Sequence, residues 1–118
     1  MKPQSAKAKG RLFQQLIRDK IIDLLKPYGV VAEDVKSTSM GAGGVDVQLS
    51  PFAKTFLPIA PECKSHNSMA VYKLWEQTVA NKGNETPVLF IKVNNKKPLV
   101  VIDLEYYLQL EKARIENE

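Results

Sequence analysis

Residues 45–64 read VDVQLSPFAKTFLPIAPECK, two apolar segments separated by a Ser-Pro pair. The first segment, 45–49, alternates apolar and polar residues, which predicts a strand with one solvated face. Ser50-Pro51 predicts a turn, after which residues 56–64 are expected to return as a second strand. The pattern therefore indicates two strands that lie side by side and are joined by a short connection.

Two carboxylates and one lysine fall on these predicted strands. Successive side chains of a strand point to opposite faces, so Glu62 and Lys64 share one face while Cys63 points the other way. If the strands pair antiparallel, Asp46 lies beside Glu62 on the shared face. Two converging carboxylates form a hard oxygen site suited to Mg²⁺ or Mn²⁺, and a nearby lysine can orient a water and stabilise charge on a phosphate. The same residues also fit an ordinary solvated strand face.

A glycine-rich loop, Gly41 to Gly44, comes directly before this aspartate strand. Because glycine has no Cβ, such a loop allows a phosphate backbone to approach closely. An ordinary connection between two strands has the same composition, so the loop alone does not distinguish the two interpretations.

An amphipathic helix is predicted upstream, from Gly10 to the Pro27 and Gly29 that end it. Its apolar residues recur at three- and four-residue spacing: Phe13, Leu16, Ile17, Ile21, Leu24 and Leu25. Residues 1–9 lack this period and are predicted as a flexible basic arm before a single domain of residues 10–118. The lysines and arginines up to Lys26 fit either a polyanion partner or a solvated tail.

The remaining segments complete a mixed α/β pattern in the order αβββαββα. Val30 to Val35 predicts the first strand, and Ser68 is expected to cap a second helix that carries Val71 to Val79. Short apolar runs at 88–91 and 99–102 predict two buried strands, which Asn94 to Lys97 joins as a hairpin turn. Asp103 is expected to cap a final helix. The sequence therefore predicts a central mixed sheet of about five strands flanked by helices.

Composition excludes several classes of protein. The chain has 118 residues, with 17 Lys and Arg against 13 Asp and Glu, a net charge of +4, and a single cysteine and histidine. One cysteine excludes an internal disulfide framework, and so few thiols and imidazoles exclude the usual Cys- or His-rich metal centres. No apolar run approaches the roughly 18 residues of a membrane span, so we expect an intracellular protein.

In their order along the chain, these motifs resemble the PD-(D/E)xK nuclease superfamily, and within it the small archaeal-type and phage Holliday junction resolvases. The matching pieces are Lys9-Gly10 at the start of the first helix, the loop 39–46 that ends in an aspartate, the E-x-K strand 61–64, the helix 72–77, and the closing strands 88–93 and 99–102. The similarity covers about residues 9–110. It implies a restriction-endonuclease-like core and a cytoplasmic location in a bacterial, archaeal or phage-infected cell.

The resemblance also implies roles for individual residues. Asp46 and Glu62 would bind Mg²⁺ or Mn²⁺ with the main-chain carbonyl of Cys63, Lys64 would position the attacking water, and Gln77 would hold a water or touch phosphate. The residues expected to contact DNA are Lys9, Arg11, Gln14, Ser39, Gly41, Gly43, Gly44 and Lys73. Because resolution of a four-way junction requires two symmetric cuts, a two-fold homodimer is expected.

One departure from the family keeps other functions open. Resolvases usually have a glutamate where this chain has Gln14, and an amide is a weaker cation ligand than a carboxylate, so a second metal position is in doubt. A same-fold nuclease that cuts duplex, nicked or flap DNA and a non-catalytic DNA-binding module are the alternatives. A nucleophile made of Cys63 and His66 is disfavoured, because Cys63 is expected to point into the core.

Overall fold

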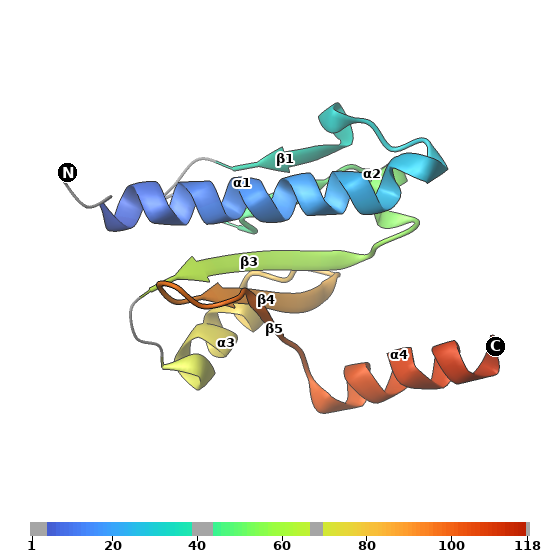
Figure 1. Ribbon diagram of the computed structural model, residues 1–118. Helices are drawn as coiled ribbons and strands as arrows, with labels where there is room; N and C mark the ends of the chain where they lie inside the picture. The colour runs from blue at the N-terminus through green and yellow to red at the C-terminus, as the bar shows by residue number, and fades with distance from the viewer. Residues whose placement is uncertain (1–4, 39–43, 67–69, 118) are drawn as a thin grey trace.

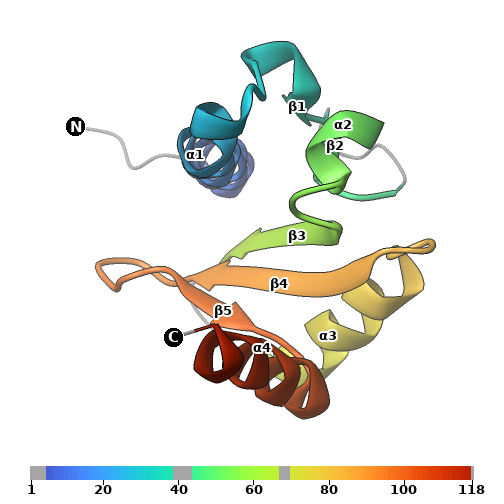
Figure 2. The same cartoon turned by 90° about the vertical axis from the view of Figure 1, so that its right-hand side faces the viewer.

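Helices lie on both sides of a three-stranded sheet in the computed structural model, which describes residues 5–38, 44–66 and 70–117. The sheet consists of β3 (Ile59–Ser65), β4 (Thr86–Lys92) and β5 (Leu99–Val101). Helix α1 (Ala6–Leu25) lies on one side, and α3 (Val71–Ala80) and α4 (Leu104–Glu116) lie on the other (Figures 1 and 2). The predicted mixed α/β class is confirmed.

The sheet is mixed, with the order β3-β4-β5. Strands β3 and β4 are parallel, with Glu62 opposite Leu89, whereas β4 and β5 are antiparallel, with Phe90 opposite Val100. The predicted hairpin between β4 and β5 is confirmed. Its turn is closed by the Lys96 N–H, which donates to the Val93 carbonyl at 3.2 Å.

The two remaining strands, β1 (Val35–Ser37) and β2 (Val47–Leu49), pair antiparallel in a separate sheet. The five described strands therefore form two sheets, which corrects the expected single sheet of about five strands. The reason lies on the side of β3 that faces β2. Pro61 has no N–H there, and the Cys63 N–H donates to the side chain of Asp46 rather than to the backbone of β2. A single backbone bond, from Asp46 N to Pro61 O at 3.1 Å, links the two segments.

Helix α1 supplies much of the core. Residues four apart place Phe13, Ile17, Ile21 and Leu25 in one buried stripe against the two sheets. The helix begins at Ala6, four residues before the predicted start at Gly10, because the Ser5 hydroxyl accepts a hydrogen bond from the Ala8 N–H at 3.1 Å. Residues 6–9, expected in the flexible arm, therefore belong to the helix, and residues 1–4 lie outside the described chain.

Two segments differ from the predicted strands. The first strand begins at Val35 rather than Val30, because residues 32–34 form a 3-10 turn in which the Asp34 carboxylate accepts from the Val31 N–H at 2.9 Å. A short helix, α2 (Pro51–Lys54), replaces the predicted turn, and the Ser50 hydroxyl caps it by accepting from the Ala53 N–H at 3.1 Å. Serine before proline is the ordinary signal for a helix start, which the turn prediction overlooked.

The final helix, α4, begins as predicted. The Asp103 carboxylate accepts from the Tyr106 N–H at 3.1 Å, and none of residues 104–116 is buried. The predicted cap of α3 at Ser68 lies outside the described residues, and Ala70 occupies the position before that helix. Among the described residues, no helix is both long and apolar enough to cross a membrane.

Candidate functional site

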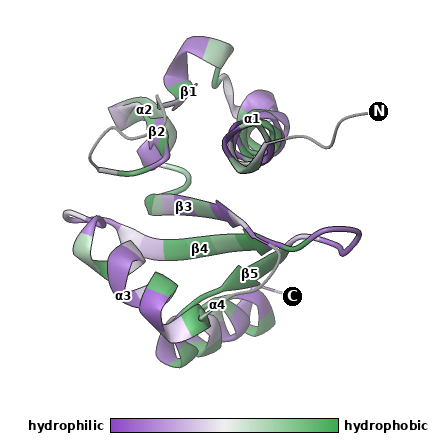
Figure 3. Cartoon of the chain, turned by 90° about the vertical axis from the view of Figure 1, so that its left-hand side faces the viewer, coloured by the Kyte–Doolittle hydropathy of each residue, from purple (hydrophilic) through white to green (hydrophobic). Residues whose placement is uncertain are grey.

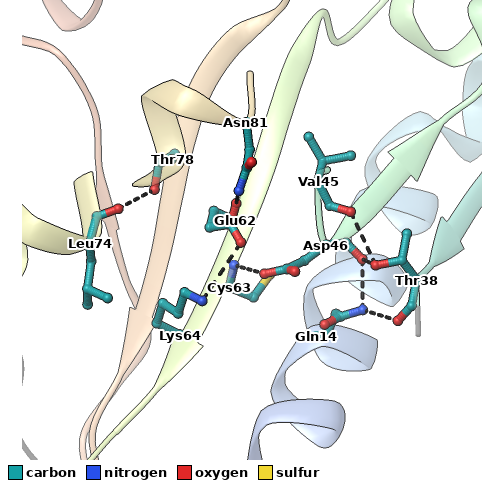
Figure 4. Close-up of polar contacts among 10 residues, drawn as sticks. All are labelled: Gln14, Thr38, Val45, Asp46, Glu62, Cys63, Lys64, Leu74, Thr78 and Asn81. Atoms are coloured by element: carbon teal, nitrogen blue, oxygen red, sulfur yellow. Dashed lines mark hydrogen bonds and ion pairs between the residues drawn. The ribbon is translucent and has the colours of Figure 1, made fainter. Parts of the chain in front are cut away.

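Asp46 is fixed against the middle of β3 by both its backbone and its side chain. Its N–H donates to the Pro61 carbonyl at 3.1 Å, and its Oδ2 accepts from the Cys63 N–H at 2.8 Å (Figure 4). The carboxylate therefore bridges from the start of β2 to β3 across the gap between the two sheets. One oxygen of the carboxylate is thus held by a backbone donor of β3.

The main-chain carbonyl of Asp46 is held just as firmly. It accepts hydrogen bonds from the Thr38 N–H at 2.9 Å, the Thr38 hydroxyl at 3.1 Å and the Gln14 amide at 2.7 Å. Residues from α1 and from the end of β1 thus converge on the peptide that carries the carboxylate. This arrangement restricts the backbone of Asp46 before any ligand binds.

Glu62 lies beside Asp46 and is almost completely buried, with 4% of its surface exposed. Its Oε2 accepts from the Asn81 side-chain amide at 3.2 Å, and its Oε1 lies 3.9 Å from the Lys64 ammonium (Figure 4). Burial, together with the adjacent Asp46 carboxylate, raises the pKa of Glu62 to about 7. The structure thus brings together the two carboxylates and the lysine that the sequence predicts on one face.

Cys63 points away from this group, as the strand alternation predicts. Its side chain is buried in the core cluster with Phe13 and Ile17, and burial raises the pKa of its thiol. A nucleophilic cysteine needs an accessible thiolate, so this environment is unfavourable for one. His66, the other residue of that alternative, is exposed at the end of β3.

Gln14 is buried, with 3% of its surface exposed, and acts as a donor. Its Nε2 lies 2.7 Å from each of three oxygens: the Ser37 hydroxyl, the Thr38 carbonyl and the Asp46 carbonyl. Because carbonyl oxygens can only accept, the group that faces them must be the amide NH₂. Gln14 therefore connects α1 to the segments around Asp46 through its nitrogen, rather than through an oxygen that could bind a cation.

The residue that follows α3 belongs to the site and was not predicted from the sequence. The predicted Gln77 is exposed, whereas Asn81, one turn later, donates to the Glu62 carboxylate. Lys73, Gln77 and Asn81 are four residues apart, so they follow one side of the helix. The signal for Asn81 was this i, i+4 spacing continued past the predicted end of the helix.

The residues expected to contact DNA are spread around this group. Lys9 is half-buried near the start of α1, Arg11 and Lys73 are exposed, and Gly44 is exposed in the left-handed conformation at φ 85°. A residue with a Cβ is strained at that φ, which explains a glycine there. The predicted Ser39, Gly41 and Gly43 lie outside the described residues.

The donor set at this site is a pair of carboxylates. Among the described residues, no three His, Cys, Asp or Glu side chains group as metal ligands, and Asp46, just before β2, is the acid that approaches Glu62 of β3. Carboxylate oxygens suit Mg²⁺, which is commonly bound through one or two carboxylates and keeps several waters. The chemistry of this carboxylate pair is therefore compatible with a hard cation.

Comparisons with protein-family models, curated proteins and solved structures found no match. The chemistry of Asp46, Glu62 and Lys64 is therefore the basis for a functional inference. Two closely spaced carboxylates require either a shared proton or a cation, and a lysine beside them provides a positive group for an anionic substrate.

Proposed function

We propose that the protein is a metal-dependent DNA endonuclease that hydrolyses phosphodiesters, with four-way or otherwise branched junctions as its substrate. The observation that carries this proposal is the convergence of Asp46, Glu62 and Lys64 at β3. The resemblance of these motifs to the PD-(D/E)xK nucleases supports the choice of DNA and of a restriction-endonuclease-like core. The net charge of +4 is compatible with a polyanionic substrate.

Asp46 and Glu62 would hold one Mg²⁺ or Mn²⁺, helped by the main-chain carbonyl of Cys63. The bound ion would act as a Lewis acid on the scissile phosphate. The buried carboxylate of Glu62 retains a proton up to about pH 7 in the absence of a cation, because burial and Asp46 both oppose its ionisation. A cation held by these residues would take the place of that proton and compensate both negative charges.

Lys64 would act on the reacting groups. Its ammonium is 3.9 Å from Glu62, too far for a strong hydrogen bond, and its side chain is partly exposed. We assign it two tasks: to orient the attacking water and to stabilise negative charge on the phosphate. In the reaction, the water oxygen would add to phosphorus while one P–O ester bond breaks, and the proton that the water loses would be balanced by protonation of the leaving oxygen, which yields a phosphate monoester and a hydroxyl. Gln77 and Asn81 lie along the neighbouring side of α3, where an amide can hold a water.

The test compares cleavage of a labelled four-way junction with cleavage of a matched duplex, in Mg²⁺ and in EDTA. Asp46→Asn removes the charge, yet its amide oxygen can still accept from the Cys63 N–H. Asp23→Asn makes the same change at an exposed position of α1 and is the matched control. We expect paired nicks in the junction with the unmodified chain and with Asp23→Asn, and none with EDTA or Asp46→Asn.

The other outcomes separate the alternatives. Equal cutting of junction and duplex would retain the nuclease and discard junction specificity. Binding without cutting in Mg²⁺ would favour the non-catalytic module. Gln14 is compatible with that alternative, because it acts as a buried donor and supplies no carboxylate. Cutting that persists in EDTA would contradict a metal-dependent mechanism.

Two symmetric cuts also require two sites, and we propose a two-fold homodimer. Its interface would include the apolar side chains that β5 and α4 leave exposed: Leu99, Val100, Leu104, Leu108 and Ile115. Leu104, Leu108 and Ile115 recur at a spacing that places them on one side of α4, and a two-fold axis would cover that side with the identical surface of a second copy. Light scattering after size exclusion tests this. Leu108→Asp should yield a monomer, and Gln109→Asp, an exposed polar position on the same helix, should leave the dimer intact.

A further inference from the structure

A groove opens at the end of the sheet where α1 begins and β4 turns into β5. It has a volume of about 480 Å³, and its polar lining comes from Lys9, Ser65, Lys92, Asn94 and Asn95. This volume is within the range of about 300–1,000 Å³ that small-molecule sites occupy. Figure 3 shows that the hairpin at its edge is hydrophilic, in contrast to the hydrophobic strands β4 and β5 that lead into it.

The two lysines of the groove lack acidic partners. The Lys9 ammonium donates to the Asn94 side-chain carbonyl at 3.3 Å, and the Lys92 ammonium lies 3.5 Å from the Val93 carbonyl. Among the ion pairs within residues 5–38, 44–66 and 70–117, none involves either lysine. Both side chains are half-buried, so two partly desolvated cations face one opening with only neutral oxygens beside them. An anion would satisfy both.

The hydrogen-bonding wall of the groove is held in place by the backbone. The His66 N–H donates to the Lys92 carbonyl at 3.0 Å and fixes the ends of β3 and β4 together. Asn95 adopts the left-handed conformation at φ 63° in the turn that the Lys96 N–H closes. Asparagine tolerates this conformation better than most residues, and here it presents a side-chain amide at the edge of the groove.

The groove is next to the candidate catalytic group along the chain. Ser65 follows Lys64 directly on β3, and neighbouring residues of a strand are about 3.3 Å apart and point to opposite faces. The groove thus opens on the α1 side of β3, at the same end of the strand as the lysine. Lys64 points to the opposite face, so a nucleic-acid strand that occupies both places would have to pass around this end of β3, which is an edge strand of its sheet.

We infer that this groove binds the phosphodiester backbone of a nucleic-acid strand, with Lys9 and Lys92 as the cations that neutralise it. The inference rests on the proposed nuclease function, because it assigns the groove to the same DNA substrate. An exposed apolar side chain at the groove, Leu12, provides a surface for a sugar or base, which a free inorganic phosphate would not use. A polymeric phosphodiester is therefore a better match than a small anion.

The experiment measures binding of a labelled four-way junction in EDTA at salt concentrations between about 50 and 200 mM. Lys9→Gln, Lys92→Gln and the double variant remove the cations of the groove. Lys20→Gln is the matched control, because Lys20 lies about three turns later on the same side of α1 and does not line the groove. The double variant should bind about 10-fold more weakly, and the slope of log Kd against log[salt] should fall by about 1–2.

Three further measurements decide between the possible results. Lys92→Arg keeps the charge and should retain the slope of the unmodified chain, which separates charge from a folding defect. Inorganic phosphate added at constant ionic strength should not displace the junction, and displacement that requires both lysines would instead indicate a site for free phosphate. If the double variant had the same slope of log Kd against log[salt] as Lys20→Gln and still cut in Mg²⁺, DNA binding in the groove would be wrong while the nuclease function stood. If the unmodified chain bound no DNA, the proposed function would fail with it.

Discussion

Helices α1 and α4 have the same kind of N-terminal cap but lie in different environments. Each has a side-chain oxygen that accepts a hydrogen bond in the first turn, from Ser5 in α1 and from Asp103 in α4, both at 3.1 Å. Yet α1 buries a full stripe of side chains, whereas α4 buries none. The comparison shows that local capping and propensity specify a helix, while the rest of the chain decides whether its apolar side is covered.

The difference lies in what each helix meets. Helix α1 packs against β1, β2 and β3, which enclose its apolar stripe and the amide of Gln14. Helix α4 leaves Leu104, Leu108 and Ile115 with 67%, 50% and 62% of their surfaces exposed. The first region is complete within one chain. The second has an apolar surface that the proposed second copy would cover, so the two regions should respond differently to substitution.

The largest effect is expected at Gln14, a buried residue of the region that is complete within one chain. Gln14→Glu would place a carboxylate against the carbonyls of Thr38 and Asp46, which can only accept, and should cost roughly 3–5 kcal/mol at neutral pH. Burial raises the pKa of such a carboxyl, so the loss should shrink as the pH falls towards its unfolded value. Gln15→Glu, next to it and exposed, should change the free energy of unfolding little. Urea unfolding at two pH values measures both. Equal losses of unfolding free energy in Gln14→Glu and Gln15→Glu would show that the amide donor of Gln14 is dispensable.

A second pair of substitutions tests the apolar stripes themselves. Ile17→Ala removes a buried side chain of α1 and should lower the free energy of unfolding by about 2–4 kcal/mol. Leu108→Ala in α4 should change it by less than about 0.5 kcal/mol at concentrations where the chain is monomeric. A loss at Leu108 comparable to that at Ile17, independent of protein concentration, would show that α4 packs on its own chain.

These contrasts also mark how far the sequence predicts the fold. The period of α1, the hairpin between β4 and β5 and the cap at Asp103 depend on neighbouring residues, so they are readable from the sequence. The division into two sheets is not, because it depends on the side chain of Asp46 reaching the Cys63 N–H across 17 positions of sequence. The start of α1 at Ala6 could also have been predicted from the serine before it, but the lysines of the first turn favour a basic arm instead.

The candidate site divides in the same way. The shared face of Glu62 and Lys64 follows from strand alternation, and the approach of Asp46 follows once the two segments lie together. The donor role of Gln14 could not be predicted, because its three acceptors come from the ends of β1 and β2. Asn81 was missed for a local reason, since it lies just after the last residue of α3 while its partner is on β3.

The pH dependence of stability extends the comparison to the two sides of β3, with Cys63 towards α1 and Glu62 towards α3. The pKa of Glu62 is about 7 in the folded chain and near 4.5 when unfolded, so the folded state holds its proton more tightly. The contribution of the protonated Glu62 side chain to the free energy of unfolding is therefore fully present below about pH 4.5 and is lost as the pH rises to about 7. In EDTA, the unmodified chain should lose roughly 1–3 kcal/mol relative to Glu62→Gln over this interval. A pH-independent difference in thermal or urea unfolding would contradict the shift.

The smallest expected effect concerns the two caps, where the helices are most alike. Ser5→Ala and Asp103→Ala each remove one oxygen that accepts from the first turn, and a cap of this kind is worth about 1 kcal/mol. In α1 the first turn is continuous with the packed stripe, so Ser5→Ala should lower the free energy of global unfolding. In the monomer, α4 can fray without exposing a core, so Asp103→Ala should reduce helical circular dichroism and protection of α4 amides from hydrogen exchange, with little effect on global unfolding. In the dimer the same substitution should weaken association, since fraying would then uncover the interface. Equal effects of both substitutions on global unfolding of the monomer would mean that α4 is as integral to the folded chain as α1.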